Sequence, residues 1–249
     1  MSRITKLLLI AVLLCGKVRA RQADDQARHI INQAIAAHGV VAKIRKLKVM
    51  QWGGMMKADL PGLGQVEGTW QQTWQLPSRV KDVQELKVNG MDLRKTQVFN
   101  GEQVWISENG QTRVVQGAER QVMQEEMYPE TLDKLVPLTE PGYGCETIPE
   151  IQIAGRPAVG VKISAPGHRD VKLYFFKDSS LLAKRENQIR DETGKLVVLE
   201  LFYSDYKNRD GLQLYHKAVA HLAGQKFEEF TITGIKFFDK LDDAVFAKP

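Results

Sequence analysis

Residues 65–76 alternate between polar and apolar side chains over twelve consecutive positions, and this pattern limits the possible folds of the chain more than any other feature. Every odd-numbered position is polar, whereas the even-numbered positions are apolar or glycine except for Gln72. A period of two places successive side chains on opposite faces of an extended strand. The segment therefore predicts a long antiparallel strand with one buried face. Residues 47–58 are its expected partner across a turn at residues 61–64.

Three Asn-Gly pairs, at residues 89–90, 100–101 and 109–110, separate the strand-forming runs that follow. Asn-Gly favours a two-residue hairpin because both residues tolerate a positive φ. Residues 47–116 therefore predict a meander of about six strands. Later strand-forming runs, mostly bounded by turn residues, are 151–154, 158–164, 171–177, 182–190, 196–206, 212–222 and 226–238.

Two helices interrupt this strand pattern. The first is expected from a cap at Asp24 or Asp25 to about residue 38, with Gly39 ending it. The second is expected over residues 118–135 and is followed by a loop at 136–150 that is rich in proline and glycine. The sequence thus predicts a mainly β (α+β) protein with one large curved antiparallel sheet, or an unclosed β-barrel, of eleven to thirteen strands.

The N-terminus has the pattern of a secretory signal peptide. Arg3 and Lys6 precede ten residues of low polarity, and Ala20 suits a signal-peptidase site. Ten such residues are too few for a membrane anchor, which needs roughly 20. A lipoprotein signal at Cys15 is the alternative, and the bulky Leu14 before it disfavours that alternative. We expect residues 1–20 to be cleaved and residues 21–249 to form a single exported domain.

The charge and cysteine content of residues 21–249 exclude two classes of protein. Residues 1–20 hold four of the 35 Lys and Arg and no acid, so 31 basic face 30 acidic side chains in the remainder. This balance gives no basic surface for nucleic acid. Cys145 is the one cysteine left after cleavage, so an intramolecular disulfide is excluded.

No recognisable catalytic or metal-binding motif occurs in the sequence. The five histidines are scattered, and His29 and His38 are expected on the exposed side of the first helix. Cys145 is expected to be a buried thiol and not a nucleophile. We therefore predict that the protein is not an enzyme and uses no metal or cofactor.

Large apolar side chains gather on the predicted strands, beside glycines that remove side chains from the same faces. Gly54 and Gly68 stand among tryptophans and methionines, which together suit an adaptable apolar pocket. The alternative is that these side chains fill an ordinary core. The candidate cavity residues are Met50, Trp52, Met56, Trp70, Trp74, Trp105, Leu199 and Leu201, and the candidate lid residues on the middle helix are Met123 and Met127.

Short motifs give the chain a family resemblance. Gly101, Val104 and Trp105 form a turn followed by a strand, and a second motif lies near the C-terminus at Tyr203, Asp205, Tyr206, Asp210, Gly211 and Leu212. The chain closes on an Asp-Asp-Ala-Val-Phe run at residues 242–246. With the signal peptide and first helix, these features resemble the LolA/LolB-like lipoprotein carrier superfamily, which includes outer membrane lipoprotein-sorting proteins and LppX-type relatives.

The resemblance implies an unclosed barrel of about eleven strands, capped by helices, around an apolar cavity that shields acyl chains of lipids or lipoproteins in the periplasm. It implies no bond chemistry, a monomeric carrier and envelope membrane proteins that load and release the cargo. The alternative is a structural envelope β-domain with a filled core and no ligand. One departure stands out: Leu76 precedes Pro77 where carriers of the LolA type have an arginine that latches the lid, and Arg79 is the nearest basic residue.

Overall fold

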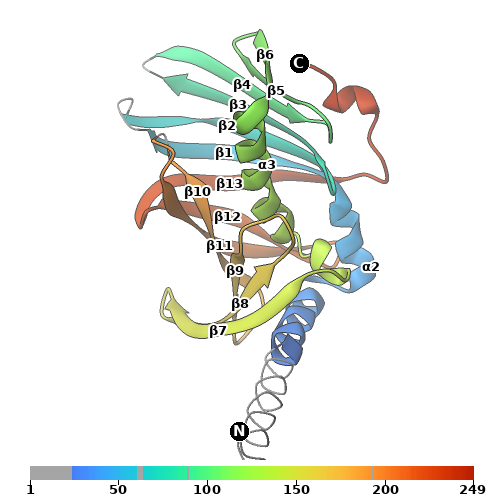
Figure 1. The fold of residues 1–249 in the computed structure, drawn as a ribbon. Coiled ribbons are helices and arrows are strands. Elements are labelled where there is room, and N and C mark those ends of the chain that lie inside the picture. The colour runs from blue at the N-terminus through green and yellow to red at the C-terminus, as the bar shows by residue number, and fades with distance from the viewer. Residues whose placement is uncertain (1–23, 61–63, 89, 192) are drawn as a thin grey trace, which may run out of the picture.

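The computed structural model describes residues 24–60, 64–88, 90–191 and 193–249. Within these residues, thirteen strands form one antiparallel sheet that does not close into a barrel (Figure 1). The prediction of a mainly β fold with one large open antiparallel sheet is confirmed. The predicted signal peptide and its cleavage site lie outside the described residues.

The strands follow one another along the chain with short connections. Their bounds are β1 Val49–Leu60, β2 Gly64–Gln75, β3 Arg79–Val88, β4 Met91–Phe99, β5 Val104–Glu108, β6 Gln111–Val115, β7 Gly144–Ile153, β8 Arg156–Ser164, β9 Val171–Phe176, β10 Leu182–Arg190, β11 Leu196–Arg209, β12 Leu212–Leu222 and β13 Gln225–Phe237. The helical elements are residues 24–38, α2 Val41–Ile44, η1 Arg45–Lys48, α3 Gly117–Leu132, η2 Pro137–Thr139 and η3 Asp243–Phe246.

One of the three predicted Asn-Gly turns forms as a two-residue hairpin, a second is part of the longer connection at residues 100–103, and Asn89 of the third lies outside the described residues. Asn109 and Gly110 both have positive φ, 49° and 87°, and join β5 to β6 in a two-residue turn. At the turn between β4 and β5, the Asn100 side chain accepts hydrogen bonds from two backbone N–H groups just after it. The predicted meander over residues 47–116 is confirmed as six consecutive antiparallel strands.

The strand order places the first strand of the chain beside the last one. Strands β1 and β13 pair at the centre of the sheet, whereas β6 and β7 are its two edges. The connection from β6 to β7 must therefore travel from one edge to the other. It does so through α3, which crosses one face of the curved sheet (Figure 1). We call the face under α3 the inner face.

Glycines in the strands serve close backbone approach and not empty space. A Cβ atom on Gly54 would overlap the carbonyl oxygen of Thr231, and one on Gly68 would overlap that of Glu85. The pairing of β1 with β13 also shifts register between Gly53 and Gly54. Such bulges and glycines bend a sheet, so the residues that seemed to leave room for a ligand instead shape the curvature.

The helix at residues 24–38 covers the β9–β10 side of the inner face. Its buried stripe is Ala27, Ile31, Ala34 and Ile35. His38 is also buried, in contrast to the exposure expected from sequence, and its Nε2 atom accepts a hydrogen bond from the backbone N–H of Leu182 at 3.3 Å. Burial lowers the pKa of His38 to about 4, which keeps the ring neutral at physiological pH.

Two further differences from the sequence prediction concern where individual elements begin and end, and not how the strands pair. Residues 144–150, expected in a loop, are part of β7, and a register shift between Ile148 and Ile151 accommodates Pro149 on this edge strand. The middle helix ends at Leu132 instead of near residue 135. No helix in the described part of the chain has the length and apolar character needed to span a bilayer.

Candidate functional site

A cavity of about 220 Å³ lies between α3 and the inner face of the sheet. Its walls come from α3 and the two residues after it, from β1 to β5 and from β11 to β13. We call this space the inner cavity. Its aromatic and apolar walls include Trp52, Trp70, Trp74, Val80, Phe99, Val104, Met123, Met127, Leu201, Tyr215, Phe230 and Ile232.

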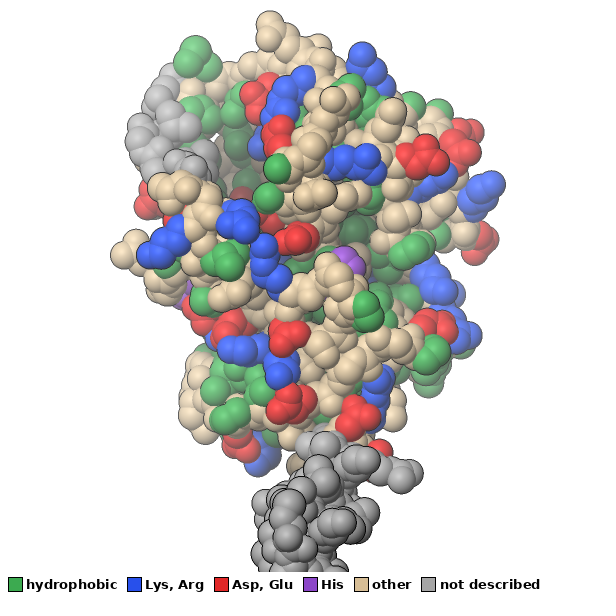
Figure 2. Space-filling view, viewed as in Figure 1, with side chains coloured by type: hydrophobic (Ala, Val, Ile, Leu, Met, Phe, Trp, Pro, Cys, Tyr) green, Lys and Arg blue, Asp and Glu red, His purple; other side chains and the backbone are tan. Residues whose placement is uncertain are grey.

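A larger cavity of about 790 Å³ adjoins it at the other side of α3. The two share the residues Trp74, Val80, Phe99 and Met127, so they are neighbours along the helix. We call the larger space the outer cavity. Its remaining walls are mostly apolar or small, from the turn after β2, the loop at 136–143 and the turn before β9. In the space-filling view, hydrophobic side chains lie in recessed parts of this face, below a surface of mixed charge (Figure 2).

Six of the ten residues singled out from sequence line the inner cavity. They are Trp52, Trp70, Trp74, Leu201, Met123 and Met127. Met50 and Met56 are buried in the core, with 1% and 2% exposure, and do not line either cavity. Leu199 lies on β11 two residues from Leu201 but is likewise absent from both linings.

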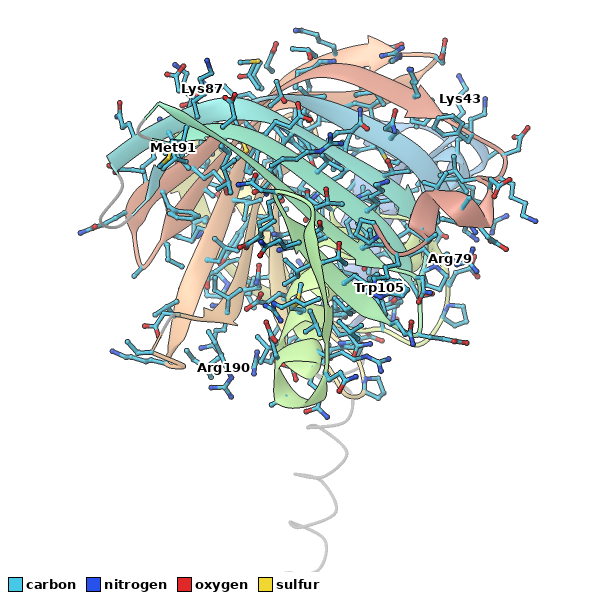
Figure 3. All side chains as sticks on the ribbon, turned by 90° about the horizontal axis from the view of Figure 1, so that it is seen from above. Lys43, Arg79, Lys87, Met91, Trp105 and Arg190 are labelled. Carbon is cyan, nitrogen blue, oxygen red and sulfur yellow. The ribbon has the colours of Figure 1, made fainter. Side chains whose placement is uncertain are left out.

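Trp105 lies on the opposite face of the sheet. It packs with Val98 and Phe246 under the C-terminal segment, and Figure 3 shows it on the side of the molecule where that segment runs. In the pairing of β4 with β5, Phe99 faces Val104 and Val98 faces Trp105, so the inner face carries Val104. The structure thus separates Trp105 from the other three tryptophans.

The C-terminal end of α3 is fixed to the sheet by a buried ion pair that the sequence analysis missed. The Arg185 guanidinium on β10 lies 2.5 Å from an oxygen of Asp133, and both side chains are almost fully buried. The same carboxylate accepts a hydrogen bond of 2.6 Å from the Tyr203 hydroxyl. No spacing in the sequence links residue 133 to residue 185, because the contact depends on how the crossover lies on the sheet.

Lys134 follows Asp133 in the sequence, and its ammonium group lies over the rings of two cavity tryptophans. Its Nζ atom lies 4.0 Å from the centre of the Trp74 ring and 4.9 Å from that of Trp52, and it donates a hydrogen bond to the backbone oxygen of Glu130. Burial lowers the pKa of Lys134 to about 8. The cation–π contact connects the crossover to β1 and β2.

Arg79 does not take the place of a lid latch. Its guanidinium pairs with Asp243 in the C-terminal segment and lies 6.0 Å from the centre of the Phe246 ring. The exposed half of α3 is held from another direction, because Glu125 pairs with Arg169 at 2.7 Å and the Tyr128 ring stacks on His168. Both partners belong to the segment between β8 and β9.

Besides Asp133, three further carboxylates line the inner cavity, and the alternation pattern did not single them out. Asp82 comes from β3, Glu130 from α3 and Glu228 from β13. Burial, reinforced by repulsion from Glu130, raises the pKa of Asp82 to about 7. Burial and the charges of Asp82 and Glu130 raise the pKa of Glu228 to about 8. The cavity is therefore aromatic with an acidic wall, and not purely apolar.

The chemistry of the side chains around the site is described by the pKa of its thiol and by the spacing of its possible metal ligands. Burial raises the pKa of the Cys145 thiol, which reduces its nucleophilic fraction at physiological pH. Among the described residues, no three His, Cys, Asp or Glu side chains are close enough to hold a metal ion. What the site provides is two neighbouring cavities whose walls include large aromatic side chains.

Comparison with solved structures identifies the fold. A LolA superfamily protein from Nitrosomonas europaea superposes with a TM-score of 0.56 at 12% identity, covering 89% of this chain and 97% of that one. The chain has the LolA-like fold. A DUF1329 family protein from Desulfovibrio piger matches with the same TM-score and coverage at 13% identity.

A third structure with the LolA-like fold comes from Vibrio parahaemolyticus and is named for outer membrane lipoprotein sorting. It has a TM-score of 0.53 and 12% identity, and the match covers 90% of this chain and 97% of that one. No family model and no curated protein sequence matches the chain. The resemblance inferred from short sequence motifs is therefore confirmed at the level of the fold.

Proposed function

We propose that this protein is an exported carrier or binding protein that shields the acyl chains of lipids or lipoproteins in the two cavities along α3. The observation that carries the proposal is the pair of adjoining cavities of about 220 and 790 Å³ between the helix and the sheet. Their size is that of a site for a small amphiphile. The LolA-like fold and the lipoprotein-sorting name of one structural neighbour support this reading.

The mechanism is partition and needs no catalytic step or cofactor. Each methylene group moved from water to an apolar wall contributes about 0.8 kcal/mol, so a single acyl chain supplies enough free energy for transfer between sites. In this proposal residues 1–20 direct export to the periplasm and are removed. Residues 21–249 act as one monomeric binding domain, and envelope membrane proteins load and release the cargo.

The direct test is extraction of lipid from the protein purified without detergent after export, followed by mass spectrometry. We expect copurified lipid and displacement of a fluorescent fatty-acyl probe by added fatty acid. Absence of both lipid and probe binding would support the alternative, an envelope β-domain with no ligand.

A matched pair of tryptophan variants localises the binding. Trp70→Glu places a charge in the inner cavity and should abolish probe binding in a protein that still folds. Trp105→Ala alters the opposite face and should leave probe binding unchanged while lowering stability, because Trp105 packs on Phe246. Equal loss of binding in both variants would place the site elsewhere.

A further inference from the structure

Three of the carboxylates that line the inner cavity form no ion pair with a described residue, although the Lys134 ammonium group lies in the same cavity. Asp82, Glu130 and Glu228 approach the cavity from three different elements, and none of them forms an ion pair within 4.0 Å in the described part of the chain. Glu130 accepts a hydrogen bond of 3.3 Å from Gln72, a neutral donor. Unpaired carboxylates that share a buried space repel one another and favour the arrival of a cation.

The aromatic walls of the same cavity already hold an ammonium group. The Lys134 side chain occupies the faces of Trp52 and Trp74. A second aromatic group remains on the other side, where Trp70 meets Phe230 in an edge-on contact with ring centres 5.1 Å apart. Aromatic faces beside carboxylates are the usual chemistry for binding an alkylammonium or quaternary ammonium group.

Trp70 adds an independent indication of a missing ligand. The residue is 7% exposed, lines the inner cavity, and its indole Nε1 atom has no hydrogen-bond partner among the described residues. Buried indole N–H groups normally find an acceptor. A ligand with a hydroxyl or carbonyl oxygen beside its amine would supply one.

We propose that the inner cavity binds the ammonium head of a cationic amphiphile, with Asp82, Glu130 and Glu228 as counter-charges and Trp70 and Phe230 as the aromatic wall. The apolar part of the molecule lies in the outer cavity, which is the larger and less charged of the two. The inference rests on the proposed function and narrows it to one class of head group.

The test compares three decyl amphiphiles below their micelle concentrations on the full, exported protein at pH 8. Decyltrimethylammonium should bind at least about tenfold more tightly than decanol, a difference of about 1.4 kcal/mol, and decyl sulfate should bind most weakly. Titration followed by tryptophan fluorescence and by calorimetry measures the three affinities. Binding of decanol without any gain for the ammonium would overturn this inference and leave the proposed function standing. Failure of all three to bind would remove the proposed function as well.

Charge-neutralising variants locate the head group. Asp82→Asn combined with Glu228→Gln keeps the shape of both side chains, and it should reduce the preference for the ammonium by about tenfold while decanol affinity stays the same. Glu85→Gln is the matched control, because Glu85 lies on the same strand but is exposed on the other face. If the double variant keeps the preference for the ammonium, these carboxylates are not the counter-charges and the proposal is overturned. If a variant fails to fold, the comparison of the three amphiphiles on the unmodified protein still tests the proposal.

The preference should also depend on pH. A bound cation favours the ionised carboxylates, so ammonium affinity should rise between pH 6 and pH 9 as Asp82 and Glu228 lose their protons, whereas decanol affinity should not. A flat ammonium profile would contradict the proposal. The other charged or titratable groups that face this site are Lys95 on β4, Asp133 and Lys134 after α3, Arg185 on β10 and Tyr215 on β12.

Discussion

The inner face of the sheet is packed in two ways. The helix at residues 24–38 meets β10 where the Leu182 N–H donates to His38, and Leu173 and Leu182 nearby in the same core have no exposed surface. Over β2 and β3, α3 covers the tryptophans but leaves the inner cavity. The two helices differ in the side chains that they present. The first helix buries the small Ala27 and Ala34, whereas α3 places Met123 and Met127 beside the indole rings of the cavity.

This difference separates two uses of the same alternating strand pattern. In the filled half, complementary shape makes a stable core. In the hollow half, broad aromatic side chains contact one another at their edges and still leave the inner cavity beside α3. We therefore expect stability to depend on the filled half and ligand binding on the hollow half, and five substitutions test that division in order of decreasing effect.

Asp133→Ala should have the largest effect on stability. It leaves the Arg185 guanidinium buried without its partner, which costs about 3–5 kcal/mol of unfolding free energy. Urea denaturation measures the loss. The control is Glu119→Ala, which breaks the exposed pair with Arg113 and should cost less than about 1 kcal/mol. Similar losses in both variants would show that α3 is not held at its C-terminal end.

Two alanine-to-leucine substitutions compare the filled and hollow halves directly. Ala34→Leu overpacks the filled half and should cost about 1–3 kcal/mol. Ala218→Leu extends a side chain into the inner cavity, so it should cost less and block binding of the acyl probe. Denaturation and probe titration on both variants check the pair, and a reversed order of stability losses would break the proposed division.

Glu228→Gln should stabilise the protein in alkaline solution. The pKa of this acid is raised from 4.5 to about 8 in the fold, so the native state holds the proton more tightly and stability falls as pH rises through that window. The amide removes this penalty. We expect a gain of roughly 1–2 kcal/mol at pH 9, reduced by solvent in the cavity, and little change at pH 5. Thermal unfolding at the two pH values measures it, and an equal change at both would contradict the buried-acid account.

Arg79→Ala should have the smallest effect. The residue pairs with Asp243 on the far side from α3, so its loss should cost about 0.5 kcal/mol and leave probe binding unchanged. A marked change in probe affinity or release rate would show instead that this region controls α3. Lys81→Ala, on the same strand, is the matched control.

The sequence was sufficient for the strands and turns because these depend on local rules. Alternation in β2 and the Asn-Gly turns determine strand, turn and neighbour without reference to the rest of the chain. Trp105 shows where this reasoning stops. Its strand alternates correctly, but the face it occupies is set by its pairing with Val98 across the turn.

The polar part of the site needed three-dimensional information. Asp82 and Glu228 lie at positions where a polar residue normally indicates a solvent-facing side chain, and only the curvature of the sheet turns them toward one cavity. Lys134 lies in a segment whose sequence is typical of the end of a helix. Its contact with Trp52 and Trp74 arises because the crossover passes over the first strands.

The pairing of β1 with β13 sets the order in which the chain can be completed. Strand β1 can pair with β2 as soon as both are synthesised, yet its other hydrogen-bonding edge stays open until residues 228–237 have been added. The hollow half of the protein thus spends nearly the whole of synthesis with an unpaired edge and uncovered indole rings. Assistance from a chaperone would matter most during that interval, and a truncation before β13 would leave a template for aggregation and not a smaller folded domain.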